Sequence, residues 1–105
     1  MRSLLGPIAE RTIQNFHCDI AFIGADSIDP DLGIYTPLLT EASLSRTMIE
    51  IAKKVIVVVD SAKFDRKSLV KISGLQPIDV IITDKNISET ALEKLRAADI
   101  EMVVV

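Results

Sequence analysis

The chain has 105 residues, with 12 Lys and Arg against 15 Asp and Glu, so its formal net charge is −3. DNA binding depends largely on cationic contacts to phosphates, so this acidic chain is not expected to bind DNA by itself. The length predicts one domain, residues 1–105, and the longest aliphatic run, 55–59, is far short of the ~20 residues that span a bilayer. One cysteine cannot form an internal disulfide, which makes the cytoplasm the expected location.

Helices and strands alternate in the first half of the chain. The sequence predicts a helix over 7–16 and an apolar strand over 18–24. A loop, 25–39, leads to a second helix over 40–53, for which Thr40 is a possible N-cap. The side chains expected on the buried helix faces are Ile8, Ile13 and Phe16 in the first helix and Leu44, Met48, Ile51 and Ala52 in the second.

The second half continues the alternation. It is predicted to contain a strand at 54–59, a loop at 61–76 with one helical turn near 67–72, a strand at 78–83, a helix from the N-cap Ser88 to 97, and a strand at 100–105. The first of these strands is so uniformly apolar that both of its faces should be covered, as in parallel sheets. The pattern predicts a parallel α/β sheet with right-handed crossovers.

Apolar residues make up 49% of the chain, but only 4% of the chain is aromatic. We attribute this aliphatic excess to buried strands and to surfaces that another half-domain or subunit covers. In parallel sheets ligands bind beyond the carboxyl ends of the strands. Three predicted loops lie there, 25–39, 60–67 and 84–87, and they hold most of the candidate site residues.

Two aspartates follow the first strand, Asp26 and Asp29. Ionised carboxylates accept hydrogen bonds from sugar hydroxyls, but aspartate also forms turns with its own backbone, and the sequence alone favours turns. Asp26, Asp29 and Asp31 lack the spacing of a calcium-binding EF-hand loop. His17 and Cys18 are one pair and make no metal site, so no metal is expected.

Thr36, Thr40 and the start of the second helix form a possible anion site, since helix N-termini present unpaired N–H groups. An ordinary capped helix is the alternative. Glu41 suits the helix dipole but would repel a phosphate placed too close. Lys63, preceded by Asp60, is either a phosphate ligand or a solvated loop lysine.

Tyr35 is the only tyrosine and lies in the first candidate loop. It either stacks on a sugar face or covers the loop, and the sequence does not separate these interpretations.

Several short motifs occur in a fixed order along the chain. They are Gly6-Pro7, Asp19, Gly24-Ala25-Asp26-Ser27-Ile28-Asp29, Thr36-Pro37, Glu41-Ala42, Arg46 with Met48, Asp60-Ser61-Ala62-Lys63-Phe64, and the run 79–84. Together they resemble the C-terminal effector-sensing domain of DeoR-family transcriptional repressors, a domain related to sugar-phosphate isomerases. Ser27, Tyr35, Leu38 and Ala62 depart from the residues usual in that family.

The resemblance implies a mostly parallel, three-layer, Rossmann-like α/β sheet, like that of ribose-5-phosphate isomerases and CoA transferases. It implies a partial domain that lacks the helix-turn-helix and the first part of the sensor domain. The implied function is sensing of a phosphorylated sugar, with DNA bound only through the absent N-terminal domain, no membrane contact, no cofactor and a homo-oligomeric assembly. The implied effector-binding residues are Gly24, Asp26, Tyr35, Thr36, Glu41 and Lys63.

Two alternatives stay open. The first is a fragment of a sugar-phosphate isomerase that uses Glu41 and Asp26 as acid and base, although a glutamate in a comparable place in the isomerases is only an analogy. The second is a scaffold without a ligand. We favour the binding module and expect no catalytic residues.

Overall fold

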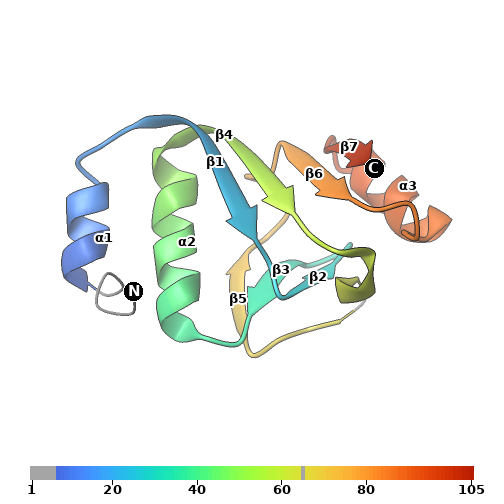
Figure 1. The fold of residues 1–105 in the computed structure, drawn as a ribbon, viewed down its shortest axis with the longest axis horizontal. Coiled ribbons are helices and arrows are strands. Elements are labelled where there is room, and N and C mark those ends of the chain that lie inside the picture. The colour runs from blue at the N-terminus through green and yellow to red at the C-terminus, as the bar shows by residue number, and fades with distance from the viewer. Residues whose placement is uncertain (1–6, 65) are drawn as a thin grey trace.

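The computed structural model describes residues 7–64 and 66–105 (Figure 1). Its elements are α1 (Pro7–Ile13), β1 (Cys18–Gly24), β2 (Ser27–Asp29), β3 (Gly33–Thr36), α2 (Leu39–Ile51), β4 (Ala52–Val58), the 3₁₀ turn η2 (Ser61–Lys63), β5 (Val70–Ser73), β6 (Val80–Thr83), α3 (Glu89–Ala97) and β7 (Glu101–Val104). The mixed α/β architecture that the sequence predicts is confirmed.

Four parallel strands form the main sheet in the order β1-β4-β6-β7, which is also their order along the chain. Each crossover therefore steps in the same direction across the sheet. Because crossovers between parallel strands are right-handed, such steps place their connections on one face. The connections contain α2, α3 and the small strands, so these elements cover a single face, which we call the inner face.

A second sheet, which the sequence analysis missed, contains three short antiparallel strands in the order β2-β3-β5. The predicted loop 25–39 therefore contains a β-hairpin, and the predicted helical turn near 67–72 is wrong because β5 occupies that segment. Gly33 opens β3 with φ +136°, a conformation that L side chains rarely adopt. The β3–β5 register shifts between Ile34 and Tyr35, directly after this glycine.

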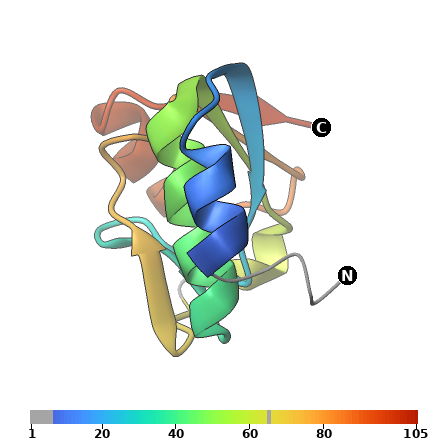
Figure 2. The same ribbon diagram turned by 90° about the vertical axis from the view of Figure 1, so that its left-hand side faces the viewer.

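Helix α2 packs against both sheets. Figure 2 shows β1 on one side of α2 and β5 on the other, and α2 contacts both. The fully buried side chains of α2 are Ala42 and Thr47. The helix begins after Leu38 and has no side-chain cap, so the prediction of Thr40 as N-cap is wrong. Arg46 ties α2 to β5 by donating hydrogen bonds to the carbonyls of Lys71 and Ile72.

Helix α1 lies against α2 rather than on a sheet (Figure 2). Ser43 of α2 donates a hydrogen bond to the Glu10 carboxylate at 2.9 Å, which joins the two helices. The expected burial of Ile8 and Phe16 is wrong, because both side chains are mostly exposed, and the side chain of Ile13 lies outside the described residues. In contrast, the Ser88 N-cap of α3 is confirmed, with Ser88 Oγ accepting from the Ala91 N–H.

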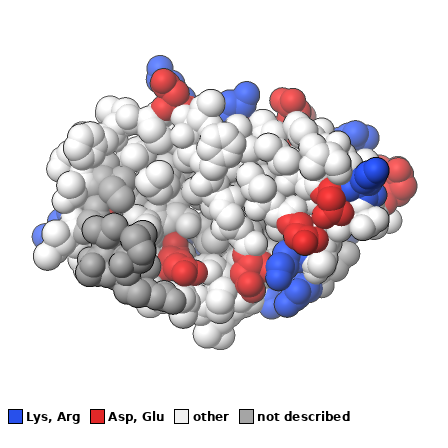
Figure 3. All heavy atoms as spheres, viewed as in Figure 1, with Lys and Arg blue, Asp and Glu red and all other residues white. Residues whose placement is uncertain are grey.

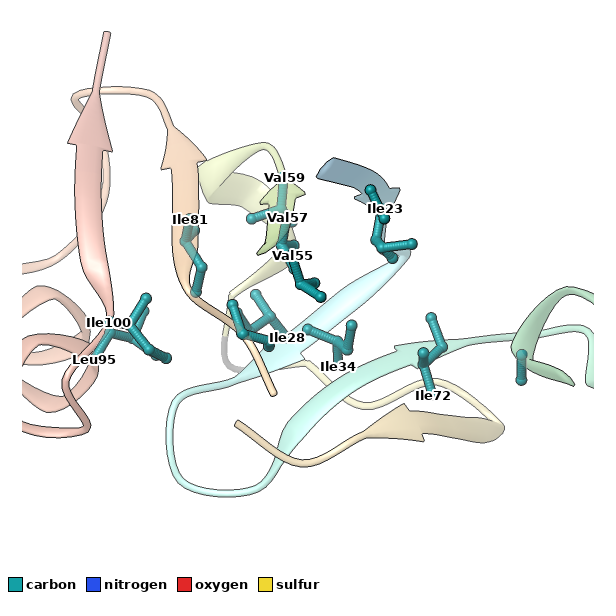
Figure 4. Packing of buried hydrophobic residues seen from close by; sticks show 13 residues of the cluster. Ile23, Ile28, Ile34, Val55, Val57, Val59, Ile72, Ile81, Leu95 and Ile100 are labelled. Atoms are coloured by element: carbon teal, nitrogen blue, oxygen red, sulfur yellow. The ribbon is translucent and has the colours of Figure 1, made fainter. Parts of the chain in front are cut away.

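The buried core lies between the inner face of the main sheet and the elements that cover it. Figure 4 shows Ile23, Val57 and Ile81 pointing from the main sheet toward Ile28 and Ile34 on the small one. Leu95 of α3 and Ile100 extend this core under the other end of the sheet. Ile28 and Ile34 are fully buried, so the small sheet contributes directly to the core.

The opposite face of the main sheet, which we call the outer face, carries the alternate side chains of the same strands. Its members by strand alternation include Ile20, Phe22, Gly24, Lys54, Ile56, Val58, Ile82 and Val103. Val58 is 48% exposed, so the prediction that both faces of the strand at 54–59 are covered is wrong for the described residues. Figure 3 shows this side of the molecule, with uncharged side chains across its middle and most charged groups toward the rim.

Candidate functional site

Two segments meet beyond the carboxyl ends of β1 and β4. The hairpin of β2 and β3 follows β1, and the 3₁₀ turn η2 follows β4. An isolated parallel bridge between Ile28 and Phe64 joins them. Candidate residues more than 30 positions apart in the sequence therefore lie in one region, as the parallel topology predicts.

The hairpin segment contains three of the predicted effector-binding residues, Asp26, Tyr35 and Thr36. Asp26 is half-buried, and its backbone N–H donates to the carbonyl of Tyr35 at 3.0 Å, which closes the hairpin at its base. Gly24 ends β1 just before it. Asp29 makes the turn expected of it, because its Oδ1 accepts from the Asp31 N–H at 2.8 Å. The backbone of Asp26 is therefore held in place by its hydrogen bond to Tyr35.

The side chains of Thr36 and Glu41 form a hydrogen bond. The Thr36 hydroxyl, on a residue that is only 5% exposed, donates to Glu41 Oε2 at 3.1 Å. Glu41 lies in the first turn of α2, where its negative charge suits the helix dipole. The N-terminus of α2 thus presents a carboxylate, so an incoming phosphate would be repelled there. The isomerase alternative would use this carboxylate as its base, and the Thr36 hydroxyl is one of its hydrogen-bond partners.

Lys63 is the cationic candidate in this region. It is half-buried at the end of η2, one residue before the Ile28–Phe64 bridge. The turn that positions it is capped by Asp60, whose Oδ1 accepts from the Ala62 N–H at 2.9 Å. The backbone at Lys63 is therefore held by a structured turn.

Asp84, which the sequence analysis did not select, anchors this turn. It follows β6 and accepts from the Ser61 hydroxyl at 2.6 Å, the Ser61 N–H at 2.9 Å and the Asn86 N–H at 3.0 Å. These bonds, that of the Ser61 hydroxyl above all, lower the pKa of Asp84 from 3.8 to about 2. The sequence offers one signal for this contact. Asp60-Ser61 follows the strand at 54–59 and Asp84 follows the strand at 78–83, and these two strands are neighbours in the sheet.

Comparison with known proteins identifies the family. The model of the DeoR C-terminal sensor domain matches residues 1–85. The chain belongs to the DeoR C-terminal sensor domain family. The resemblance seen in the sequence motifs is thereby confirmed.

The relatives of this DeoR sensor domain are transcriptional regulators. It is 46% identical over 99% of its length to a protein named as aga operon transcriptional repressor from Escherichia coli O157:H7. It is 43% identical over 90% of its length to the transcriptional repressor AccR of Agrobacterium fabrum, and 32% identical over 75% to the glycerol-3-phosphate regulon repressor of Escherichia coli K12. The chain spans 39%, 38% and 32% of these three relatives.

A hollow of about 230 Å³ lies beside the anchored turn, at the carboxyl ends of β4 and β6. Its lining residues are Val58, Val59, Asp60, Ile82, Thr83, Asp84 and Val105. Among the described residues, the Thr83 hydroxyl is buried without a hydrogen-bond partner. The DeoR sensor domain thus has an open, mainly apolar recess next to the segment that carries Lys63.

Within residues 7–64 and 66–105, no group of three or more His, Cys, Asp or Glu side chains is arranged to hold a metal ion. No helix in that part of the chain is long and apolar enough to cross a membrane.

The Asp84 bonds predict a pH-dependent contribution to stability. A folded-state pKa below the ordinary value means that this contribution is complete above pH 3.8 and is lost as the pH falls toward 2. Asp84→Asn should therefore lower the urea midpoint most at neutral pH, with a difference from the unsubstituted chain that shrinks below pH 4. Urea titrations between pH 7 and pH 2.5 measure this difference. A constant difference over that range would contradict the assignment.

Proposed function

We propose that this chain is the effector-sensing part of a DeoR-type transcriptional repressor of carbohydrate metabolism, and that it binds a phosphorylated sugar or a related metabolite. Membership of the sensor-domain family and the regulatory names of the relatives support the repressor role. One relative is named for the glycerol-3-phosphate regulon, which supports a phosphorylated polyol or sugar as the class of effector.

The observation that carries the proposal is the meeting of the hairpin and η2. The Ile28–Phe64 bridge brings the segment of Lys63 beside the segment of Asp26. Lysine is a compact point charge suited to a phosphate, and an aspartate carboxylate accepts hydrogen bonds from sugar hydroxyls. Lys63 then holds the phosphate, and Asp26 holds the hydroxyls, with Gly24 and Tyr35 lining the site. Thr36 and Glu41, joined by their hydrogen bond, line one side of the site.

In the whole regulator, DNA contact belongs to a separate N-terminal domain, and the chain described here is not an enzyme. The effector relieves repression by a population shift, so it must bind the state of low DNA affinity more tightly. We also infer that the chain acts in the cytoplasm as a homo-oligomer. Its many exposed apolar side chains support the homo-oligomeric assembly.

Replacement of Lys63 tests the phosphate assignment. A hydrogen bond to a charged group contributes about 1.5–3 kcal/mol, so Lys63→Ala should weaken binding of a phosphorylated sugar by roughly 10- to 100-fold. The same sugar without its phosphate should lose far less. Isothermal titration calorimetry with both sugars measures the two effects.

The matched control is Lys53→Ala, because Lys53 is exposed near the amino end of β4, at the opposite end of the strand. This variant should bind both sugars as the unsubstituted chain does. Equal losses for the two sugars in Lys63→Ala would remove Lys63 from the phosphate role. If the unsubstituted chain binds no phosphorylated sugar, the proposed ligand class is wrong for this chain.

A further inference from the structure

We propose that the recess at the carboxyl ends of β4 and β6 is a binding subsite for an uncharged ligand group that offers hydrocarbon surface and one hydrogen-bonding oxygen. The Thr83 hydroxyl is the polar contact of this group. The subsite rests on the proposed function only in that the group belongs to the effector, whose phosphate is held at Lys63. The recess itself can be tested without any phosphorylated ligand.

The recess crosses the end of the main sheet. Its lining includes residues 58–59 at the end of β4 and residues 82–83 at the end of β6, which are neighbouring strands. Consecutive side chains of a strand point to opposite faces, so the recess belongs to the strand ends rather than to the outer face.

Backbone hydrogen bonds hold these strand ends together. The Val59 N–H donates to the Ile82 carbonyl at 3.0 Å. The Val105 N–H donates to the Thr83 carbonyl at 2.9 Å, so the end of β7 is attached as well. The ladder thus continues up to the recess, and the recess is built on a fixed part of the sheet.

The Thr83 hydroxyl lacks a partner in the free chain. Thr83 is 3% exposed, and its hydroxyl is buried without a hydrogen-bond partner in the part of the chain that the structure describes. Such groups are uncommon in folded proteins because they cost free energy. Rotation of the side chain between staggered rotamers exchanges the hydroxyl and the methyl group, which turns the hydroxyl toward the recess. A ligand oxygen there supplies the missing partner.

The lining determines the chemical class of the ligand group. Val58, Ile82 and Val105 supply apolar contacts. Asp60 and Asp84 add two carboxylates, and Asp84, with a pKa of about 2, is charged at neutral pH, so a phosphate would be repelled. The volume of about 230 Å³ is below the roughly 300–1,000 Å³ of pockets for drug-sized ligands. The recess therefore holds one uncharged end of a ligand rather than all of it.

The recess adjoins the turn that carries Lys63. Asp60 belongs to the lining of the recess and also caps η2, and Lys63 is the last residue of that turn. A ligand with its phosphate at Lys63 can therefore place its uncharged end in the recess. The two places have opposite preferences for charge, and this difference orients the ligand.

NMR titration of the isotope-labelled chain tests the preference of the recess. The probe is 2-propanol, which has two methyl groups and one hydroxyl, and acetate is an anion of similar size. We expect saturable amide shifts with 2-propanol at residues 58–60, 82–84 and 105, with a dissociation constant on the order of 100 mM for so small a ligand. Acetate should give no saturable shifts there.

Thr83→Val separates a ligand contact from a structural role. Valine keeps the shape of threonine without the hydroxyl, so the variant should raise the urea midpoint of the free chain. It should also weaken binding of 2-propanol by roughly three- to tenfold, the loss expected for one neutral hydrogen bond. A threonine with only a structural role would instead lose stability and leave the binding of 2-propanol unchanged.

Thr47→Val is the matched control. Thr47 is also buried, but its hydroxyl donates to the Ser43 carbonyl at 3.2 Å. This variant should not raise the urea midpoint, and it should bind 2-propanol as the unsubstituted chain does.

The outcomes for the subsite and for the proposed function are separate, because 2-propanol carries no phosphate. Equal shifts with acetate and 2-propanol, no shifts at the recess, or a lower urea midpoint in Thr83→Val would overturn the subsite. If 2-propanol binds there but no phosphorylated sugar does, the subsite stands and the proposed ligand class fails. For a phosphorylated sugar that binds, an unchanged affinity in Thr83→Val would remove the recess from the effector site.

Discussion

Gly33→Ala should cost about 2–4 kcal/mol of the free energy of unfolding, since it combines backbone strain with a clash. Gly33 has φ +136°, and a Cβ atom there would lie 2.0 Å from the carbonyl oxygen of Ser73. That oxygen belongs to β5, so the backbone of β3 or β5 must move and the small sheet must distort. The hairpin that carries Asp26 and Tyr35 is part of this sheet, so effector binding should weaken as well.

Gly24→Ala is the matched control. A Cβ atom on Gly24 meets nothing within 4 Å, so the substitution should change the free energy of unfolding by less than about 0.5 kcal/mol, as at most surface positions. Urea denaturation followed by circular dichroism compares the two variants. Equal losses in both would contradict the clash at β5.

Ile28→Ala should destabilise the chain by about 2–5 kcal/mol, the usual range for truncation of a buried isoleucine. Ile28 is fully buried between the two sheets and also forms the bridge to Phe64. The cavity would loosen the contact between the hairpin and η2. Ile8→Ala removes the same atoms from a side chain that is 78% exposed and should have little effect. Thermal and urea denaturation provide the measurements, and similar losses in the two variants would contradict the role of Ile28 in the core.

The elements with strong local signals were predictable. The strand at 18–24 has the predicted bounds, and Ser88 caps α3 as its sequence indicates. These elements depend on apolar runs and on capping chemistry, both of which are local. The parallel order of the main sheet then follows from the alternation of helix and strand.

The small sheet was not predictable from the same signals. β2 has three residues and β3 four, too short for a clear alternation, and β5 pairs with β3 from more than 30 residues away. The start of α2 was misplaced because Leu38 precedes the helix without a capping side chain, whereas Thr40 has the preferred chemistry. The exposure of the outer face depends on which face the crossovers cover, which no single strand reveals.

The candidate site was predictable in its parts and less so in its contacts. The topology predicts that loops 25–39 and 60–67 meet, and the Ile28–Phe64 bridge agrees with this. The Thr36–Glu41 bond was not predicted, because a helix N-terminus alone suggests an anion site. Asp84 was missed because its role depends on Ser61, which belongs to the preceding strand end.

The most direct test of the account is a map of effector contacts by NMR. Backbone amide signals of the isotope-labelled chain should be recorded during titration with pentose and hexose phosphates, and with the same sugars without phosphate. We predict saturable shifts at residues 26–36 and 60–64 for a phosphorylated sugar, with smaller shifts for its unphosphorylated form. The absence of shifts with every sugar phosphate, or shifts confined to α1 and α3, would contradict the proposed effector site.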